Sequence, residues 1–198
     1  SNLEARTAER MNWDVESNVI PIPIPGMHEL LEDGGTPIKT LSFCLTRSGG
    51  GKTTFLITLA KAAMLANKKV MYISAELSAD QIIKKFDSCF TGVPVREIKK
   101  AAKEVRAKIL ASDRYKEAMN RLHLIEVPMN AVSVRDVRKF VQDAKKTVFY
   151  PDLLIVDYAD NLLPSRFNPN ATRLELGGIY RDLRSLGQAE GCAVWTAS

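Results

Sequence analysis

The sequence predicts an α/β protein built on a doubly wound, mostly parallel sheet with helices on both faces. From residue 39 onward, short apolar segments alternate with longer segments of helical periodicity. The apolar segments are continuous, as at residues 153–156, which is typical of strands buried on both faces. A helix between each pair of strands supplies the right-handed crossover that parallel neighbours need.

Composition places the chain among globular proteins with a hydrophobic core. It has 198 residues, of which 45% are hydrophobic and 26% charged, which suits one domain of ordinary size. No apolar run approaches the roughly 20 residues that cross a membrane, and no export signal is visible. We therefore expect a cytoplasmic protein without a membrane partner.

Five strands and at least five helices are expected in chain order. The strands fall at residues 41–45, 70–75, 122–127, 153–156 and 192–197. The helices fall at residues 53–67, 79–91, 133–146 and 174–190, with one or two more between 96 and 121. Ser78 and Gln81 have the spacing of a capping box at the start of the second helix.

The segments outside this alternating order are assigned from their turn residues and polarity. Residues 1–19 are expected to form an N-terminal arm or linker helix, and residues 20–198 the globular core. The Ile-Pro repeat at 20–25 forces an extended path, and residues 34–37 read as a turn. Residues 163–173 are expected to form a loop.

Positive charge is concentrated in one segment. Residues 96–121 contain nine basic and four acidic residues, so this segment has a net charge of +5, equal to that of the whole chain. Such a segment is able to attract nucleic acid. Its Lys/Glu/Ala-rich pattern is also that of a solvated helix, and this second interpretation is favoured.

A glycine-rich loop between the first strand and the first long helix predicts a phosphate-binding site. The loop, residues 48–54, reads Ser-Gly-Gly-Gly-Lys-Thr-Thr. Gly49, Gly50 and Gly51 leave backbone N–H groups free to point at phosphate oxygens, and the helix start adds its positive dipole end. Lys52 is expected to reach the β- and γ-phosphates and Thr53 to bind Mg²⁺. Thr46 occupies the position where the usual motif has its first glycine.

Two carboxylates end neighbouring strands of the predicted sheet. Ligands of doubly wound sheets lie beyond the carboxyl ends of the strands, so Asp157 is expected to hold Mg²⁺ opposite Thr53. Glu76 ends another strand and is placed to orient and deprotonate an attacking water. The alternatives are a strand-ending Asp157 that caps a turn and an exposed Glu76 beside the helix cap.

Together these segments resemble the DnaB-like replicative helicases, RecA-like P-loop ATPases, and most of all their phage versions. The resemblance rests on residues 22–35, 46–53, 70–78 and 153–158, and extends to 193–198. The family phosphate loop commonly lacks the first glycine and has arginine next, as Arg47 is here.

The resemblance implies an ATP-dependent helicase motor that translocates on single-stranded DNA as a homo-hexamer in a bacterial or phage-infected cell. It implies that ATP and Mg²⁺ are bound by residues 47–54, Arg47, Ser48 and Thr54 among them, that Asp157 binds the metal, and that Glu76 and Lys52 are catalytic. It also makes Arg166 and Arg173 candidate DNA ligands, because they lie in the loop where the family contacts DNA. Primase or a helicase loader is a candidate protein partner. The family's γ-phosphate-sensing glutamine and arginine finger would follow residue 198, so the core is expected to be incomplete at its C-terminal end.

Two other functions fit the same motifs. One is a RecA-type or clock-type oligomeric ATPase. The other is a nucleotide-gated module that loads or regulates a replication factor without unwinding DNA. Stimulation of ATP hydrolysis by single-stranded DNA distinguishes the motor from a regulatory ATPase, which responds to a protein partner instead.

Overall fold

The computed structural model describes residues 18–31, 34–47, 49–164 and 172–198. In chain order, its elements are β1 (Val19–Pro21), α3 (Met27–Leu30), β2 (Gly35–Pro37), β3 (Leu41–Cys44), α4 (Lys52–Leu65), β4 (Val70–Ser74), α5 (Ala79–Thr91), η1 (Val95–Glu97), α6 (Ala102–Ala111), α7 (Asp113–Met119), β5 (Leu122–Glu126), α8 (Val134–Lys146), β6 (Leu153–Asp157), η2 (Ala159–Asn161), α9 (Thr172–Glu190) and β7 (Ala193–Ala197). No helix in these ranges is long and apolar enough to span a bilayer.

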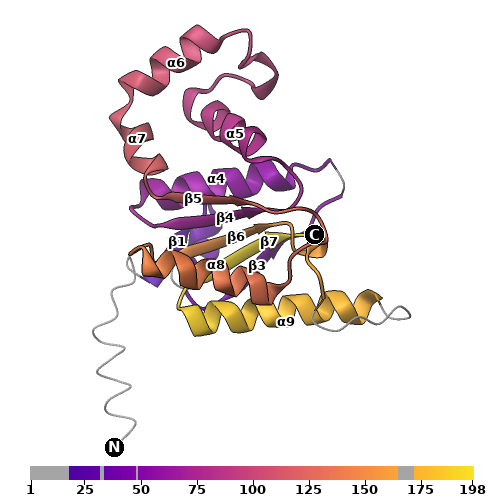
Figure 1. The fold of residues 1–198 in the computed structure, drawn as a ribbon. Coiled ribbons are helices and arrows are strands. Elements are labelled where there is room, and N and C mark those ends of the chain that lie inside the picture. Colours follow the sequence, from indigo (N-terminus) through magenta and orange to yellow (C-terminus); the bar gives the residue numbers. More distant parts are fainter. Residues whose placement is uncertain (1–17, 32–33, 48, 165–171) are drawn as a thin grey trace, which may run out of the picture.

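A parallel sheet of five strands forms the centre of the molecule, in the order β3-β7-β6-β4-β5. Helices α4 and α5 lie over one face and α8 and α9 over the other (Figure 1). The α/β class, the parallel strands and the helices on both faces are thus confirmed. Because all five strands run in one direction, their carboxyl ends meet at one edge, where the loops that follow them gather.

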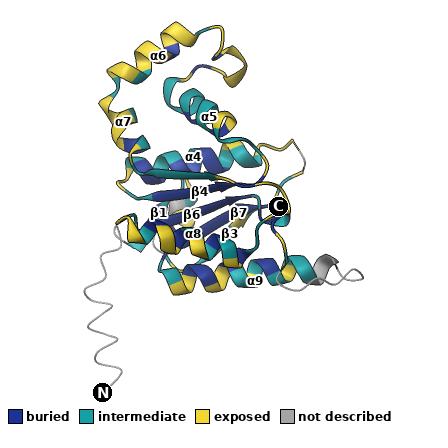
Figure 2. Cartoon of the chain, in the orientation of Figure 1, coloured by how far each residue is buried: buried dark blue, intermediate teal, exposed yellow. Residues whose placement is uncertain are grey.

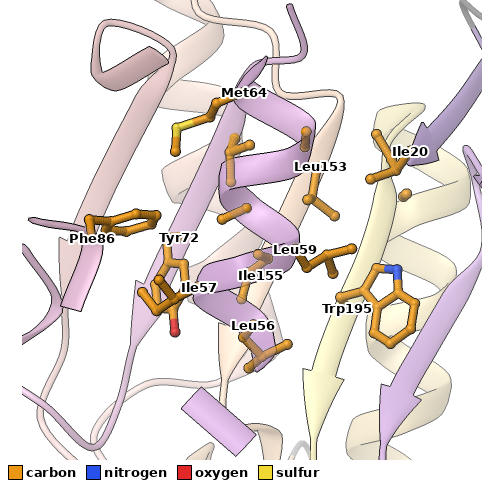
Figure 3. Close-up of a cluster of buried hydrophobic side chains, with 14 of the residues drawn as sticks. Ile20, Leu56, Ile57, Leu59, Met64, Tyr72, Phe86, Leu153, Ile155 and Trp195 are labelled. Atoms are coloured by element: carbon orange, nitrogen blue, oxygen red, sulfur yellow. The ribbon is translucent and has the colours of Figure 1, made fainter. Parts of the chain in front are cut away.

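Alternate residues of each strand enter two separate hydrophobic clusters. On β4, Tyr72 packs beneath α4 and α5, whereas Met71 and Ile73 pack against the α8 and α9 side. All five β4 residues are buried, which explains the nearly continuous apolar sequence of this central strand (Figure 2). Figure 3 shows Leu56 and Leu59 of α4 packed between strand side chains that include Trp195.

The segment at residues 34–37, expected to be a turn, is largely a strand. Gly35–Pro37 forms β2 and pairs antiparallel with β1, so only Gly34 retains turn geometry, with φ at 72°. An added Cβ at Gly35 would lie 2.6 Å from the Ile20 carbonyl oxygen, so glycine permits the close approach of the two strands. Trp195 of the central sheet donates its indole N–H to Thr36, with Nε1 3.1 Å from Oγ1, and thereby ties the ribbon to the core.

The basic segment 96–121 forms η1, α6 and α7, in agreement with the expected one or two helices. These elements extend outward beyond α5 (Figure 1), and Val105 is the buried residue of α6. Figure 2 shows most of α6 exposed. The exposure agrees with a solvated helix and leaves the basic side chains accessible.

The remaining boundaries agree with the sequence pattern to within about two residues, the usual uncertainty of helix ends. The capping box of α5 is present, with Ser78 and Gln81 bonded reciprocally, and Gly92 ends the helix in a left-handed conformation. The last helix begins at Thr172, two residues earlier than expected. Residues 1–17 of the predicted arm lie outside the described part of the chain, so the division at residue 19 stays a prediction.

Two glycines of α9 provide a matched test of its packing. A Cβ at Gly187 would lie 2.8 Å from Val194 Cγ2 and 3.0 Å from the Cys192 carbonyl oxygen, whereas a Cβ at Gly177 meets nothing within 4 Å. We expect Gly187→Ala to lower the free energy of unfolding by roughly 1–3 kcal/mol through overpacking. Gly177→Ala should raise it by about 0.5–1 kcal/mol, because alanine favours a helix interior. Urea unfolding measures both, and equal effects of the two changes would contradict the tight contact of α9 with β7.

Candidate nucleotide-binding site

Three connections that leave the carboxyl edge of the sheet surround one pocket. They are the β3–α4 loop, the β4–α5 connection and the end of β6. The pocket has a volume of about 320 Å³. Its lining residues are Gly49, Gly51, Lys52, Thr53, Thr54, Glu76, Lys85 and Tyr158. The structure therefore brings together the phosphate-loop residues and Glu76, as the sequence predicts.

The phosphate loop depends on its glycines for two different reasons. Gly49 and Gly51 have φ values of 74° and 86°, in the left-handed region that residues with a side chain rarely adopt. Gly50 is needed for space, because an added Cβ would overlap Thr46 Oγ1 and lie 2.8 Å from the Arg47 carbonyl oxygen. That carbonyl accepts the Gly50 N–H at 2.9 Å and closes the turn. The threonine at the usual first-glycine position thus fills space inside the loop and makes glycine obligatory at residue 50.

Helix α4 begins at Lys52, directly beside the pocket. None of the described side chains caps its N-terminus, so its first N–H groups are available to a bound anion. The Lys52 ammonium lies over the Tyr158 ring, with Nζ 4.8 Å from the ring centroid. Lys52 is therefore already directed across the pocket toward the end of β6.

Asp157 is a fully buried carboxylate at the end of β6. It accepts hydrogen bonds from Tyr72, with Oη 2.7 Å from Oδ2, and from Thr53, with Oγ1 3.4 Å from Oδ1. Burial raises the pKa of Asp157 above its ordinary value, and the two hydrogen bonds and then the charges of Lys85 and Lys52 oppose that shift. Burial beside this carboxylate also raises the pKa of Tyr72, which therefore remains a proton donor.

The neighbouring oxygens of Thr53 and Asp157 fit a magnesium ion. Mg²⁺ prefers oxygen ligands and is usually held by one or two protein groups together with water and substrate phosphates. A hydroxyl and a carboxylate 3.4 Å apart, next to a phosphate loop, have that chemistry. The described residues contain no group of three or more histidines, cysteines and carboxylates that would suit a metal held by protein alone.

The other predicted site residues differ in position. Glu76 is exposed at the mouth of the pocket, and Arg47 is exposed beside the loop. Ser48 and Arg166 lie outside the described residues, and of Arg173 only the backbone is described, in the first turn of α9. The roles of Arg166 and Arg173 toward DNA therefore stay predictions.

Sequence reasoning assigned no role to Lys85 or Tyr72. Tyr72 is a strand residue among other apolar residues, and nothing in the pattern shows that its hydroxyl reaches Asp157. Lys85 lies three residues after the buried Ile82 and directly before the buried Phe86. Its position at the edge of the apolar face of α5 was the one sequence signal that placed it near the core.

Comparison with known proteins decides the family. The model of the DnaB-like helicase C-terminal domain matches residues 32–198. The chain belongs to this family. The match includes the phosphate loop, Glu76 and Asp157, so the resemblance drawn from the motifs is confirmed.

Individual relatives in the family are distant in sequence and close in fold. A DnaB-like replicative helicase of Enterobacteria phage T4 is 24% identical over 203 aligned residues, which cover 100% of this chain and 42% of the relative. The solved structure of a DnaB-like replicative helicase, described with its interactions with primase, superposes with a TM-score of 0.77 at 19% identity and covers 100% of this chain and 48% of that one. A solved ATPase domain gives a TM-score of 0.73 at 20% identity, covering 100% of this chain and 69% of that one. The chain thus spans less than half the length of the first two proteins, and its RecA-like fold is confirmed.

The contact between Gly50 and Thr46 predicts a partial rescue. Gly50→Ala should weaken nucleotide binding by roughly tenfold or more, since an overlap that distorts the loop costs about 1–3 kcal/mol. Adding Thr46→Gly removes the overlap with the hydroxyl but not the contact with the Arg47 carbonyl, so affinity should recover in part. Equilibrium titration with a fluorescent nucleotide measures all three proteins. Full affinity in Gly50→Ala alone would exclude the packing seen in the loop.

The buried Asp157 carboxylate predicts a gain in stability when its charge is removed. A carboxyl group whose pKa is raised on folding destabilises the folded protein above that pKa, and the penalty disappears below the unfolded value of about 3.9. Asp157→Asn keeps an oxygen for the Tyr72 hydroxyl and removes the charge. We expect a higher melting temperature at pH 7 in the absence of nucleotide, with a smaller difference near pH 4. A lower melting temperature at pH 7 would show that the hydrogen bonds to the carboxylate outweigh its desolvation.

Proposed function

We propose that this chain is the ATP-hydrolysing motor of a replicative DNA helicase, which couples ATP hydrolysis to translocation on single-stranded DNA. The observation that carries the proposal is the convergence of Lys52, Thr53 and Glu76 on one pocket, with Asp157 hydrogen-bonded to Thr53, in a chain of the DnaB-like family.

Each side chain has a distinct part in this proposal. The phosphate-loop N–H groups and Lys52 bind the phosphates and stabilise charge that develops during transfer. Glu76, exposed at the mouth of the pocket, orients the attacking water and accepts its proton. Its exposure supports this part, because the carboxylate is freely reached by water.

Magnesium would be held by Thr53 and Asp157, and when bound it neutralises phosphate charge. Tyr72 fixes the carboxylate from behind, so one oxygen remains directed toward Thr53. Substrate and metal would then be positioned by groups that hydrogen bonds hold in a defined geometry, and positioning is the main requirement for phosphoryl transfer.

A neighbouring subunit would complete the site. The pocket is open on the side of Gly49, Gly51 and Glu76, all of which are exposed in the single chain. An arginine from the next subunit of a ring, most simply a homo-hexamer, would cover this side and supply charge to the transition state. Primase is a candidate partner, since the similar helicase structure is described with its primase interactions.

Two substitutions in the full-length protein separate binding from hydrolysis. Glu76→Gln should bind Mg·ATP with near-normal affinity and hydrolyse it roughly 10²–10⁴-fold more slowly, because it lacks the general base. Lys52→Ala should bind ATP much more weakly. Single-stranded DNA should stimulate ATP hydrolysis by the unmodified protein and unwinding should follow. Unchanged ATP binding by Lys52→Ala would exclude the pocket as the site, and hydrolysis indifferent to DNA but activated by a protein would favour the regulatory alternative.

A further inference from the structure

Lys85 is a second cation in the nucleotide pocket, and the site described above gives it no function. It is half-buried on α5 and lines the same pocket as Lys52, Thr53 and Glu76. The other pocket-lining lysine, Lys52, lies at the start of α4 and belongs to the phosphate loop. Lys85 is therefore directed into the site rather than into solvent.

The start of α5 is held firmly beside the pocket. Ser78 and Gln81 form the capping box at its N-terminus. Glu126, at the end of the edge strand β5, accepts the Ala79 N–H at 2.7 Å between N and Oε2. The helix start is thus fixed to the same edge of the sheet that carries Glu76.

The other end of α5 is fixed to α4, the helix that follows the phosphate loop. Lys61 donates to the Cys89 carbonyl, with Nζ 2.6 Å from the oxygen. Between the two ends, Ile82 and Phe86 are fully buried against the core. Because α5 has little freedom to move, the base of Lys85 keeps a constant position relative to the phosphate loop, as a binding group requires.

Lys85 enters the pocket from the same connection as Glu76. The phosphate loop leaves β3, whereas Glu76 and α5 follow β4, and two other strands separate β3 from β4 in the sheet. In the proposed function, which this argument presupposes, Glu76 orients water for attack on the terminal phosphate. The terminal phosphate must then lie toward Glu76, which is also the side of Lys85, while the inner phosphates lie toward the loop.

The charge of the pocket supports the same assignment. Among the described side chains that line the pocket, Lys52 and Lys85 are the cations that balance the carboxylate of Glu76 and the several negative charges of a triphosphate. We propose that the Lys85 ammonium binds the terminal phosphate of a nucleoside triphosphate and so makes the pocket prefer triphosphate to diphosphate. A lysine ammonium is a compact positive charge with three donors, and it forms charge-assisted hydrogen bonds to phosphate oxygens.

Removing the charge should lower the affinity for triphosphate selectively. In the full-length protein with excess Mg²⁺, Lys85→Met should bind a non-hydrolysable ATP analogue roughly tenfold or more weakly, with ADP affinity changed less than about twofold. Calorimetric titration measures both constants. Lys85→Arg should retain the preference for triphosphate, because it keeps a charged donor.

Lys84 provides the matched control. It precedes Lys85 on α5, is also half-buried and does not line the pocket, so Lys84→Met should leave both affinities unchanged. Equal losses of ADP and ATP-analogue affinity in Lys85→Met would overturn the proposal, and so would unchanged affinities. A loss in Lys84→Met as large as that in Lys85→Met would overturn it too, since the effect would then come from the helix and not from the contact.

Amine labelling of the unmodified protein gives a readout that does not depend on the folding of a variant. Lys85 should be protected from an amine-reactive reagent by the ATP analogue but not by ADP, as measured by peptide mass spectrometry. Lys52 should be protected by both nucleotides. Protection of Lys52 by both, with Lys85 labelled equally in all samples, would overturn the role of Lys85 alone. Failure of both nucleotides to protect Lys52 would instead contradict the proposed function.

Discussion

The hydrogen bonds to the buried carboxylate of Asp157 are the contact on which the arrangement of the site depends. Asp157 is reached from one side by Tyr72 of the adjacent strand and from the other by Thr53 of the first long helix. These bonds join the end of β6 to α4 and β4, whose contacting residues lie 104 and 85 positions earlier in the chain. A charged group without them would be too costly to bury, so the site and the core require one another.

The same contact explains a conflict between stability and function. Every residue of β6 is buried, and its last residue is ionisable where the apolar pattern would favour another valine or isoleucine. Desolvation of this carboxylate disfavours the folded protein, whereas a carboxylate at this point is what a magnesium site needs. A structural strand end would not keep such a group, which favours the functional explanation of Asp157 over a turn cap.

The sequence was sufficient to predict the order of the elements and the place of the glycine loop between β3 and α4, because both depend on short-range sequence patterns. Continuous apolar strands, the Ser78–Gln81 capping box and the glycine loop are local features. The sequence did not predict the β1–β2 ribbon. Ile20 and Gly35 lie in separate segments, and no local pattern shows that the two segments pair as strands. The sequence also did not show which side chains of α5 line the pocket. Helical periodicity identifies the buried face of a helix, but it does not show which part of the protein lies beside the edge of that face.

Helix α5 contributes to the site although its sequence contains no known functional motif. Its own sequence contains no recognisable nucleotide motif, yet Glu126 at its start and Lys61 near its end bind it to a strand and a helix on either side. Because Glu76 precedes this helix and Lys85 lies on it, any shift of α5 would move a carboxylate and an ammonium together relative to the phosphate loop. The distance between the two halves of the pocket is therefore set by the packing of α5 on α4.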